Sequence, residues 1–183
     1  MTWSMRSITK TMLPVLAVLT SIEIAMGLVL SSFESTLFQY PSLLVLVPVI
    51  IGTAGSLGST LSARLSTAFH LGLLEFKFSN YHLTGNILST MALSITIFPL
   101  IGAITWVVST IVFEPLLGLS QIVLITTFSG ILISIFTAII ALITTYSSYL
   151  LRLDPDDVVI PTVTNLCDVF GIFVLLTAIF FLI

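Results

Sequence analysis

The chain has 183 residues, of which 57% are hydrophobic and only 7% are charged, and its mean hydropathy is +1.25. A soluble domain carries roughly 25% charged residues, so this composition excludes a water-soluble fold and indicates an integral membrane protein. The net charge of −3 is too small to indicate a nucleic acid or another polyionic partner, and the single cysteine, Cys167, excludes an intrachain disulfide and a multi-cysteine metal cluster.

Five stretches are long and apolar enough to cross a lipid bilayer, which takes about 20 mostly apolar residues. We predict transmembrane helices near residues 12–30, 42–63, 85–113, 121–150 and 158–183. The third and fourth stretches are long enough to tilt or to project into water. The predicted fold class is therefore an all-α integral membrane protein with five transmembrane helices, formed as a single domain over residues 1–183.

The basic residues orient these five helices. With five spans, all of them fall on the same side of the membrane: Arg6, Lys10, Arg64, Lys77 and Arg152. The connectors on the other side, at residues 31–41 and 114–120, contain no Lys or Arg. The positive-inside rule makes the basic side cytoplasmic, so we predict an N-terminus in the cytoplasm and a C-terminus outside. A four-span arrangement would scatter the same charges over both sides.

The N-terminal apolar run has a second interpretation. Arg6 and Lys10 precede it, as basic residues precede the core of a secretory signal peptide. However, Glu23 interrupts the run and no small-residue cleavage site follows it. We therefore interpret the run as a retained first span.

Two acids lie at membrane depth. Glu23 is about halfway along the first span, and Asp168 is ten residues into the fifth, roughly 15 Å from its start and near the midplane. A charge at mid-helix costs about 2.5–3.5 kcal/mol on insertion scales. Every Lys and Arg lies outside the predicted spans. The two acids must therefore be protonated, reach water, or bind a cation from outside the chain.

The neighbours of Asp168 favour water or a cation. Thr164 lies one helical turn before it and Gly171 nearly one turn after, so the three share a face that Asn165 borders. This gives an oxygen-rich stripe with a small residue that leaves room. Cys167 points about 100° away, so a mixed thiolate site is not expected. The structural alternative is a protonated Asp168 bonded to a neighbouring helix.

The stretch before Asp168 begins with three acids. Asp154-Pro155 fits a helix N-cap followed by proline at the first helical position, and Asp156 and Asp157 then favour the first turn. If the helix begins there, Pro161 is interior and supplies no N–H for the carbonyl of Asp157. The freed carbonyl and the acids would form an oxygen cluster suited to hard cations; an ordinary helix start is the alternative.

The second span contains "GTAGSLGST" at residues 52–60, with three glycines and four hydroxyls. The glycines permit close packing of helices, or they loosen a segment that lines a water-filled path, with Ser56 among its polar groups. Both can hold on opposite faces. A phosphate-binding loop is excluded because no Lys follows in the required place. His70 and His82 fall in the next connector, so an intramembrane enzyme is not indicated.

Two segments resemble a known family. "PVIIGTAGSLGSTLSARLSTA" at residues 48–68 and "DPDDVVIPTVTNLCDVFG" at residues 154–171 are similar to the second and fifth helices of the MgtE magnesium channels and the related SLC41 cation transporters. The resemblance covers essentially the whole chain and concerns the integral-membrane domain. The cytoplasmic N-domain and CBS domains of MgtE channels have no counterpart here, and the chain resembles one half of the longer SLC41 proteins.

The resemblance implies a homodimer with a cation path along its axis, lined by the second and fifth helices. Asp168 matches the family's pore aspartate, and Thr164 matches a position whose backbone carbonyl faces the ion. The chain also departs from the pattern. Ser56, Ser59 and Thr60 stand at positions of the glycine segment where MgtE-type helices often carry amide side chains. Ile160 stands where some members have Asn.

We therefore predict a multi-pass protein of the cell membrane that is not an enzyme and that transports divalent cations as a transporter or channel. Mg²⁺ is the first candidate ion, with Mn²⁺, Co²⁺ and Zn²⁺ as others. The predicted metal contacts are Asp168, Thr164, Glu23, Ser56, Asn165 and Asp157, with Glu23 as a coupling or second cation site. The alternatives are a proton- or sodium-coupled carrier of another small cation and a non-transporting membrane subunit.

Overall fold

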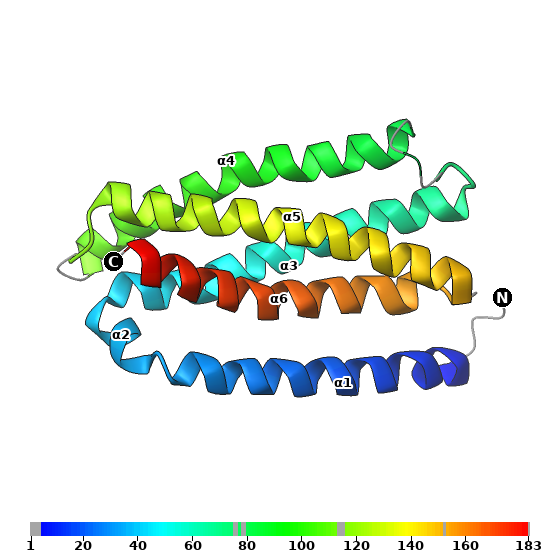
Figure 1. Cartoon of the computed structure of the whole chain (residues 1–183), viewed down its shortest axis with the longest axis horizontal. Helices are drawn as coiled ribbons and strands as arrows, with labels where there is room; N and C mark the ends of the chain where they lie inside the picture. The colour runs from blue at the N-terminus through cyan, green and yellow to red at the C-terminus, as the bar shows by residue number, and fades with distance from the viewer. Residues whose placement is uncertain (1–4, 75–76, 78–79, 113–115, 152, 183) are drawn as a thin grey trace.

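The computed structural model describes residues 5–74, 77, 80–112, 116–151 and 153–182, and within these ranges the only regular elements are helices. They are α1 (Met5–Ser31), α2 (Glu34–Gln39), α3 (Pro41–His70), α4 (Tyr81–Val112), α5 (Leu119–Leu151) and α6 (Pro155–Leu182). All but α2 are long and apolar enough to cross a membrane. These five run back and forth as one elongated bundle (Figure 1). The predicted all-α, five-span fold is confirmed.

Several boundaries differ from the predicted ones. The helix α1 begins at Met5, seven residues before the predicted start of the first span. The six-residue helix α2 lies in the first connector and was not predicted. The helix α3 continues to His70, seven residues beyond the predicted end. The helix α4 begins at Tyr81, so His82 belongs to a helix rather than to a connector. The predicted span ends at Phe113 and Ile183 lie outside the described residues.

The last two turns of α3 are amphipathic, which explains why the helix continues. Leu61, Leu65 and Ala68 are buried on one face, whereas Arg64 and Thr67 are exposed on the other. Residues at this spacing share a helix face, so the apolar face still packs against the bundle while the polar face leaves it. The uniformly apolar part of the sequence, on which the predicted boundary was based, therefore ends before the helix does.

The helices α3, α5 and α6 form the centre of the bundle, with α1 on one edge and α4 on the other (Figure 1). The core includes Leu46 on α3, Ile133 on α5 and Val163 on α6, which are all buried. The helix α1 packs mainly on α6 and exposes most of its surface. Large apolar side chains cover the outside of the bundle, as a lipid-facing surface requires.

The contact between α4 and α5 depends on small residues. Gly130 of α5 lies directly against the ring of Phe98 of α4, where a Cβ atom would collide with it. Ser134 donates a hydrogen bond to Ser94 across the same contact. Small residues and hydroxyls hold helices together where lipid removes the hydrophobic driving force, and this pair follows that rule.

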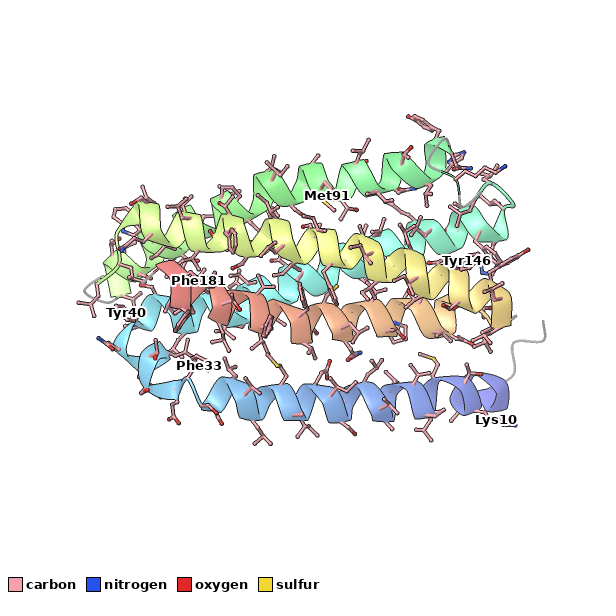
Figure 2. All side chains as sticks on the ribbon, viewed as in Figure 1. Lys10, Phe33, Tyr40, Met91, Tyr146 and Phe181 are labelled. Carbon is pink, nitrogen blue, oxygen red and sulfur yellow. The ribbon has the colours of Figure 1, made fainter. Side chains whose placement is uncertain are left out.

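The two ends of the bundle differ in charge. Lys10 lies at the end that also holds the α3–α4 and α5–α6 connectors, whereas Phe33 and Tyr40 lie at the opposite end (Figure 2). Arg64 and Lys77 belong to the same end as Lys10. We call it the basic end. This grouping agrees with the predicted one, although Arg152 lies outside the described residues. That the basic end faces the cytoplasm stays a prediction.

Candidate cation site

Asp168 lies midway along α6 and is half-buried, facing the glycine segment of α3. A Cβ atom on Gly55 would come within 2.9 Å of the Asp168 Oδ1 atom and 3.2 Å of the Thr164 Cγ2 atom. Ordinary van der Waals contact begins at about 3.4 Å. Only glycine at position 55 therefore leaves space for both side chains at this helix crossing.

Gly58 extends the same close contact by one turn. A Cβ atom there would lie 3.0 Å from Val163 Cγ1 and 3.2 Å from the Cys167 Sγ atom. The two glycines thus set the separation of α3 and α6, and with it the position of the Asp168 carboxylate. The prediction of close helix packing is confirmed for this segment.

The alternative of an irregular, loosened backbone is wrong, because α3 is helical from Pro41 to His70. Some of the small and polar residues of α3 nonetheless lie on an exposed face of the helix. Gly52, Ser56 and Thr60 follow each other at intervals of four residues and are all exposed. The hydroxyl of Ser56 donates a 2.8 Å hydrogen bond to the carbonyl of Gly52. Ser56 therefore lies beside the α3–α6 contact rather than within it.

Glu23 is the second acid at this depth. It is half-buried on the face of α1 that packs on α6, in line with Leu19 and Leu30. It lies close enough to Asp168 for the two negative charges to repel each other. The packing of α1 on α6 thus places on adjoining helices two acids that are 145 residues apart in the sequence. Nothing in the local pattern of either segment indicates this proximity.

Thr164 and Asn165 are half-buried beside Asp168 on α6. The Thr164 hydroxyl donates to the carbonyl of Ile160 at 2.9 Å, and the Asn165 side-chain NH₂ donates to the carbonyl of Pro161 at 2.9 Å. These bonds use the single O–H donor of Thr164 and one of the two N–H donors of Asn165. The hydroxyl oxygen and the amide oxygen keep acceptor lone pairs, which are what a hard cation needs.

Cys167 is fully buried and turned towards α5, where its Sγ atom lies 3.0 Å from the Thr137 hydroxyl. Its direction agrees with the predicted 100° offset from Asp168. The chemistry around Asp168 is therefore that of oxygen ligands rather than of a thiolate.

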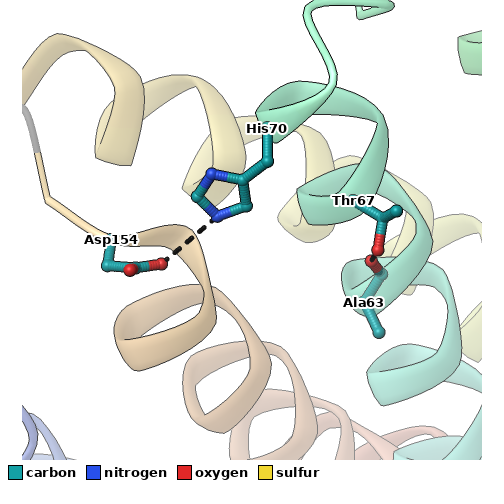
Figure 3. A network of polar contacts seen from close by, with 4 residues as sticks. All are labelled: Ala63, Thr67, His70 and Asp154. Atoms are coloured by element: carbon teal, nitrogen blue, oxygen red, sulfur yellow. Dashed lines mark hydrogen bonds and ion pairs between the residues drawn. The ribbon is translucent and has the colours of Figure 1, made fainter. Parts of the chain in front are cut away.

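The start of α6 forms a separate polar region at the basic end. The helix begins at Pro155, as predicted, and the Asp157 N–H donates to the carbonyl of Asp154 at 3.2 Å. The Asp154 Oδ1 atom lies 3.4 Å from the His70 Nε2 atom at the end of α3 (Figure 3). This contact joins the ends of α3 and α6, and no feature of the sequence indicated it.

Asp157 belongs to this region and not to the surroundings of Asp168. It lies eleven residues earlier on α6, which is about 17 Å along the helix. Pro161 is inside α6, as predicted, so it supplies no N–H for the carbonyl of Asp157. The side chain of Asp156 lies outside what the structure describes.

Within the described ranges, no group of three or more His, Cys, Asp or Glu side chains converges in the way a metal-ion site requires. The fold instead places two carboxylates, Glu23 of α1 and Asp168 of α6, at mid-depth within the range at which their charges interact, with Thr164 one helical turn before Asp168. Among the residues that the structure describes, no Lys or Arg lies at this level of the bundle. The predicted residues thus divide into a mid-depth group, an exposed Ser56 on α3, and Asp157 at the basic end.

A bundle with five helices that are long and apolar enough to cross a bilayer defines a multi-pass membrane protein. The model of the MgtE family, described as divalent cation transporter, matches residues 47–178. The chain belongs to this family. No curated protein and no solved structure matches the chain. The matched region contains α6 up to Ala178 and all but the first six residues of α3, and so includes both sides of the Gly55–Asp168 contact.

Proposed function

We propose that the protein carries Mg²⁺ across the membrane as a homodimer, with the path on the dimer axis between the α3 and α6 helices of two copies. The observation that carries this proposal is the half-buried Asp168 carboxylate at mid-depth, set against Gly55 and near a second acid, Glu23. The proposal goes beyond the family's general activity in naming the ion, the dimer and the residues.

Among the described residues, no Lys or Arg lies at the level of Glu23 and Asp168 to balance their negative charge. One charged group at mid-membrane costs about 2.5–3.5 kcal/mol on insertion scales, and two acids at close range also repel each other. A divalent cation supplies two positive charges at the place where the sequence has no Lys or Arg. Binding such an ion offsets both penalties, and its departure restores them, which suits a site that an ion occupies only in passing.

The exposed polar face of α3 supports a second copy. Gly52, Ser56 and Thr60 present small and hydroxyl groups outwards, although lipid favours large apolar side chains at this depth. A partner copy with the same face would cover these groups and enclose a polar path. Twofold symmetry would also bring two Asp168 carboxylates to one axis. A single chain supplies only half of that charge.

Mg²⁺ suits this set of groups because it gives up water reluctantly and is commonly held by one or two carboxylates while keeping several waters. Paired Asp168 side chains, with hydroxyls from Thr164 and Ser56, would contact the hydrated ion. Membrane potential would drive uptake by about 2.3 kcal/mol per charge per 100 mV, which is about 4.6 kcal/mol for a divalent ion. Asp157 and Asp154 would then lie at the cytoplasmic mouth.

A coupled carrier is the second candidate, and the proximity of Glu23 to Asp168 favours it. A proton or Na⁺ on Glu23 would reduce its repulsion of Asp168 and so change the affinity of Asp168 for the transported cation. In this form Glu23 is the coupling site. Such a carrier would move cations against their gradient, whereas a channel would not.

The test is Mg²⁺ flux into liposomes that contain the purified protein, under an inside-negative potential. We expect saturable uptake by the wild type and a loss of at least tenfold in Asp168→Asn, which keeps the shape of the side chain. Glu34→Gln is the matched control, because it removes an exposed acid on α2, at the end of the bundle opposite the basic end and away from Asp168. Wild-type flux in Asp168→Asn would remove Asp168 from the path.

The same liposomes separate the two candidates. Uptake by the coupled carrier should follow an imposed Na⁺ or H⁺ gradient, and Glu23→Gln should abolish this dependence. Uptake by a channel should follow only the Mg²⁺ gradient and the potential. An absence of flux under every gradient would favour a non-transporting membrane subunit.

A further inference from the structure

A groove of about 560 Å³ lies between α3 and α4 at the basic end of the bundle, apart from the mid-depth acids. One wall is an exposed face of α3 with Thr60, Arg64 and Thr67, and the other is the first turn of α4 with His82 and Asn86. Leu71 and Leu73, which follow the end of α3, also line the groove. Its volume is in the range of ligand pockets.

The charged and polar groups of the groove favour an anion. Arg64 is exposed, and no carboxylate of the described residues pairs with it. Among the described residues that line the groove there is no Asp or Glu, so none of them opposes Arg64 with a negative charge. His82, on the facing wall, adds a ring N–H or a positive charge. Two opposed basic groups across an open groove are suited to a phosphate.

Most of the surface of the groove is nonetheless apolar, and this favours one kind of phosphate-containing ligand over others. Ala63, Ala68, Leu71 and Leu73 are the apolar residues that line the groove. Arg64 lies six residues before the end of α3, about 9 Å below it, which is the depth at which a long basic side chain reaches the lipid headgroups. A free phosphate or nucleotide would leave these apolar walls in contact with water. A phospholipid would cover them with its acyl chain.

We propose that this groove binds an anionic phospholipid, with its phosphate between Arg64 and His82 and the start of an acyl chain along the apolar wall. The ligand would occupy the leaflet at the basic end, where juxtamembrane basic residues favour anionic lipid. The site would link lipid composition to the α3–α4 contact, and α3 is the helix that also positions Asp168. It does not depend on which cation the protein carries.

The experiment counts bound lipid by native mass spectrometry of the intact protein, after incubation with phosphatidylglycerol or phosphatidylcholine. We expect the wild type to retain phosphatidylglycerol selectively, and Arg64→Ala to weaken this binding at least tenfold. Lys10→Ala is the matched control, because it removes one exposed positive charge at the same end but on α1. Arg64→Lys should keep part of the binding, since it keeps the charge but loses the guanidinium fork.

Ala63→Trp provides an independent variant that keeps Arg64. Ala63 is exposed on α3 and lines the groove, so a large side chain should fill the space without disturbing the core, and lipid retention should fall. This variant keeps the test decisive if Arg64→Ala does not fold.

Four results would overturn the proposal. The first is equal retention of the two lipids by the wild type. The second is unchanged retention in both Arg64→Ala and Ala63→Trp. The third is displacement of the lipid by millimolar inorganic phosphate, which would assign the groove to a soluble anion. The fourth is dissociation of a dimer in Arg64→Ala with the lipid count per chain unchanged, which would make the groove an interface between copies.

Discussion

Replacing Gly55 by alanine should impair cation transport while the bundle stays folded. The new Cβ atom would lie 2.9 Å from the Asp168 Oδ1 atom, about 0.5 Å closer than the 3.4 Å at which ordinary contact begins. The atom that must yield is the end of a short side chain and not backbone. The carboxylate can therefore rotate away, at a cost of about 0.5–1.5 kcal/mol for a strained rotamer.

The expected effect on stability is small for this reason. Alanine gains up to about 1 kcal/mol over glycine within a helix, which offsets the rotamer strain. The effect on transport should be larger, because metal–ligand distances are held to about 0.2 Å and the carboxylate must move by more than twice that. We expect at least a tenfold loss in the apparent affinity for Mg²⁺, equivalent to about 1.4 kcal/mol.

The assay is the concentration dependence of Mg²⁺ uptake into liposomes, with thermal unfolding measured on the same preparations. Gly85→Ala on α4 is the matched control, since a Cβ atom there meets nothing within 4 Å. Uptake by Gly55→Ala that equals uptake by Gly85→Ala would refute the assignment of Gly55 and Asp168 to one site. A failure of Gly55→Ala to fold would refute the claim that the side chain yields before the backbone.

Three further predictions concern the scaffold. Gly130→Ala should destabilise the bundle by about 1–3 kcal/mol through overpacking against Phe98, and Phe98→Leu in the same chain should restore part of this in thermal unfolding. A double-mutant cycle with His70→Ala and Asp154→Ala should give a coupling below about 1 kcal/mol, because both side chains are partly exposed; a larger value would show that the pair locks α3 to α6. Cys167 should resist maleimide in the folded protein and react after denaturation, since its side chain is fully buried; rapid labelling would contradict the position of α6.

The number and approximate positions of the spans follow from the sequence because each is a long apolar run. The end of α3 does not, because Arg64 and Thr67 lower the hydropathy of a segment whose other face, with Leu61 and Leu65, is still buried. The helix α2 is missed because six residues carry too little periodicity. Local composition therefore identifies the apolar spans that a lipid bilayer requires. It does not identify the helix end and the short helix that depend on tertiary packing.

The candidate site divides in the same way. Asp168, Thr164 and Asn165 lie within one turn of a single helix, so their spacing is sufficient to group them. Glu23 joins them only through the packing of α1 on α6, and His70 meets Asp154 only through the packing of α3 beside α6. Such contacts between distant segments leave no trace in the spacing of a single sequence.

The central claim is that two copies of Asp168 hold one divalent cation. The most direct test is the stoichiometry of bound Mn²⁺, a paramagnetic substitute for Mg²⁺, measured by electron paramagnetic resonance on the purified protein and on Asp168→Asn. We expect the wild type to bind one Mn²⁺ ion for every two chains, displaced by competing Mg²⁺, and the variant to bind none. One such ion per chain, or binding that survives in Asp168→Asn, would contradict it.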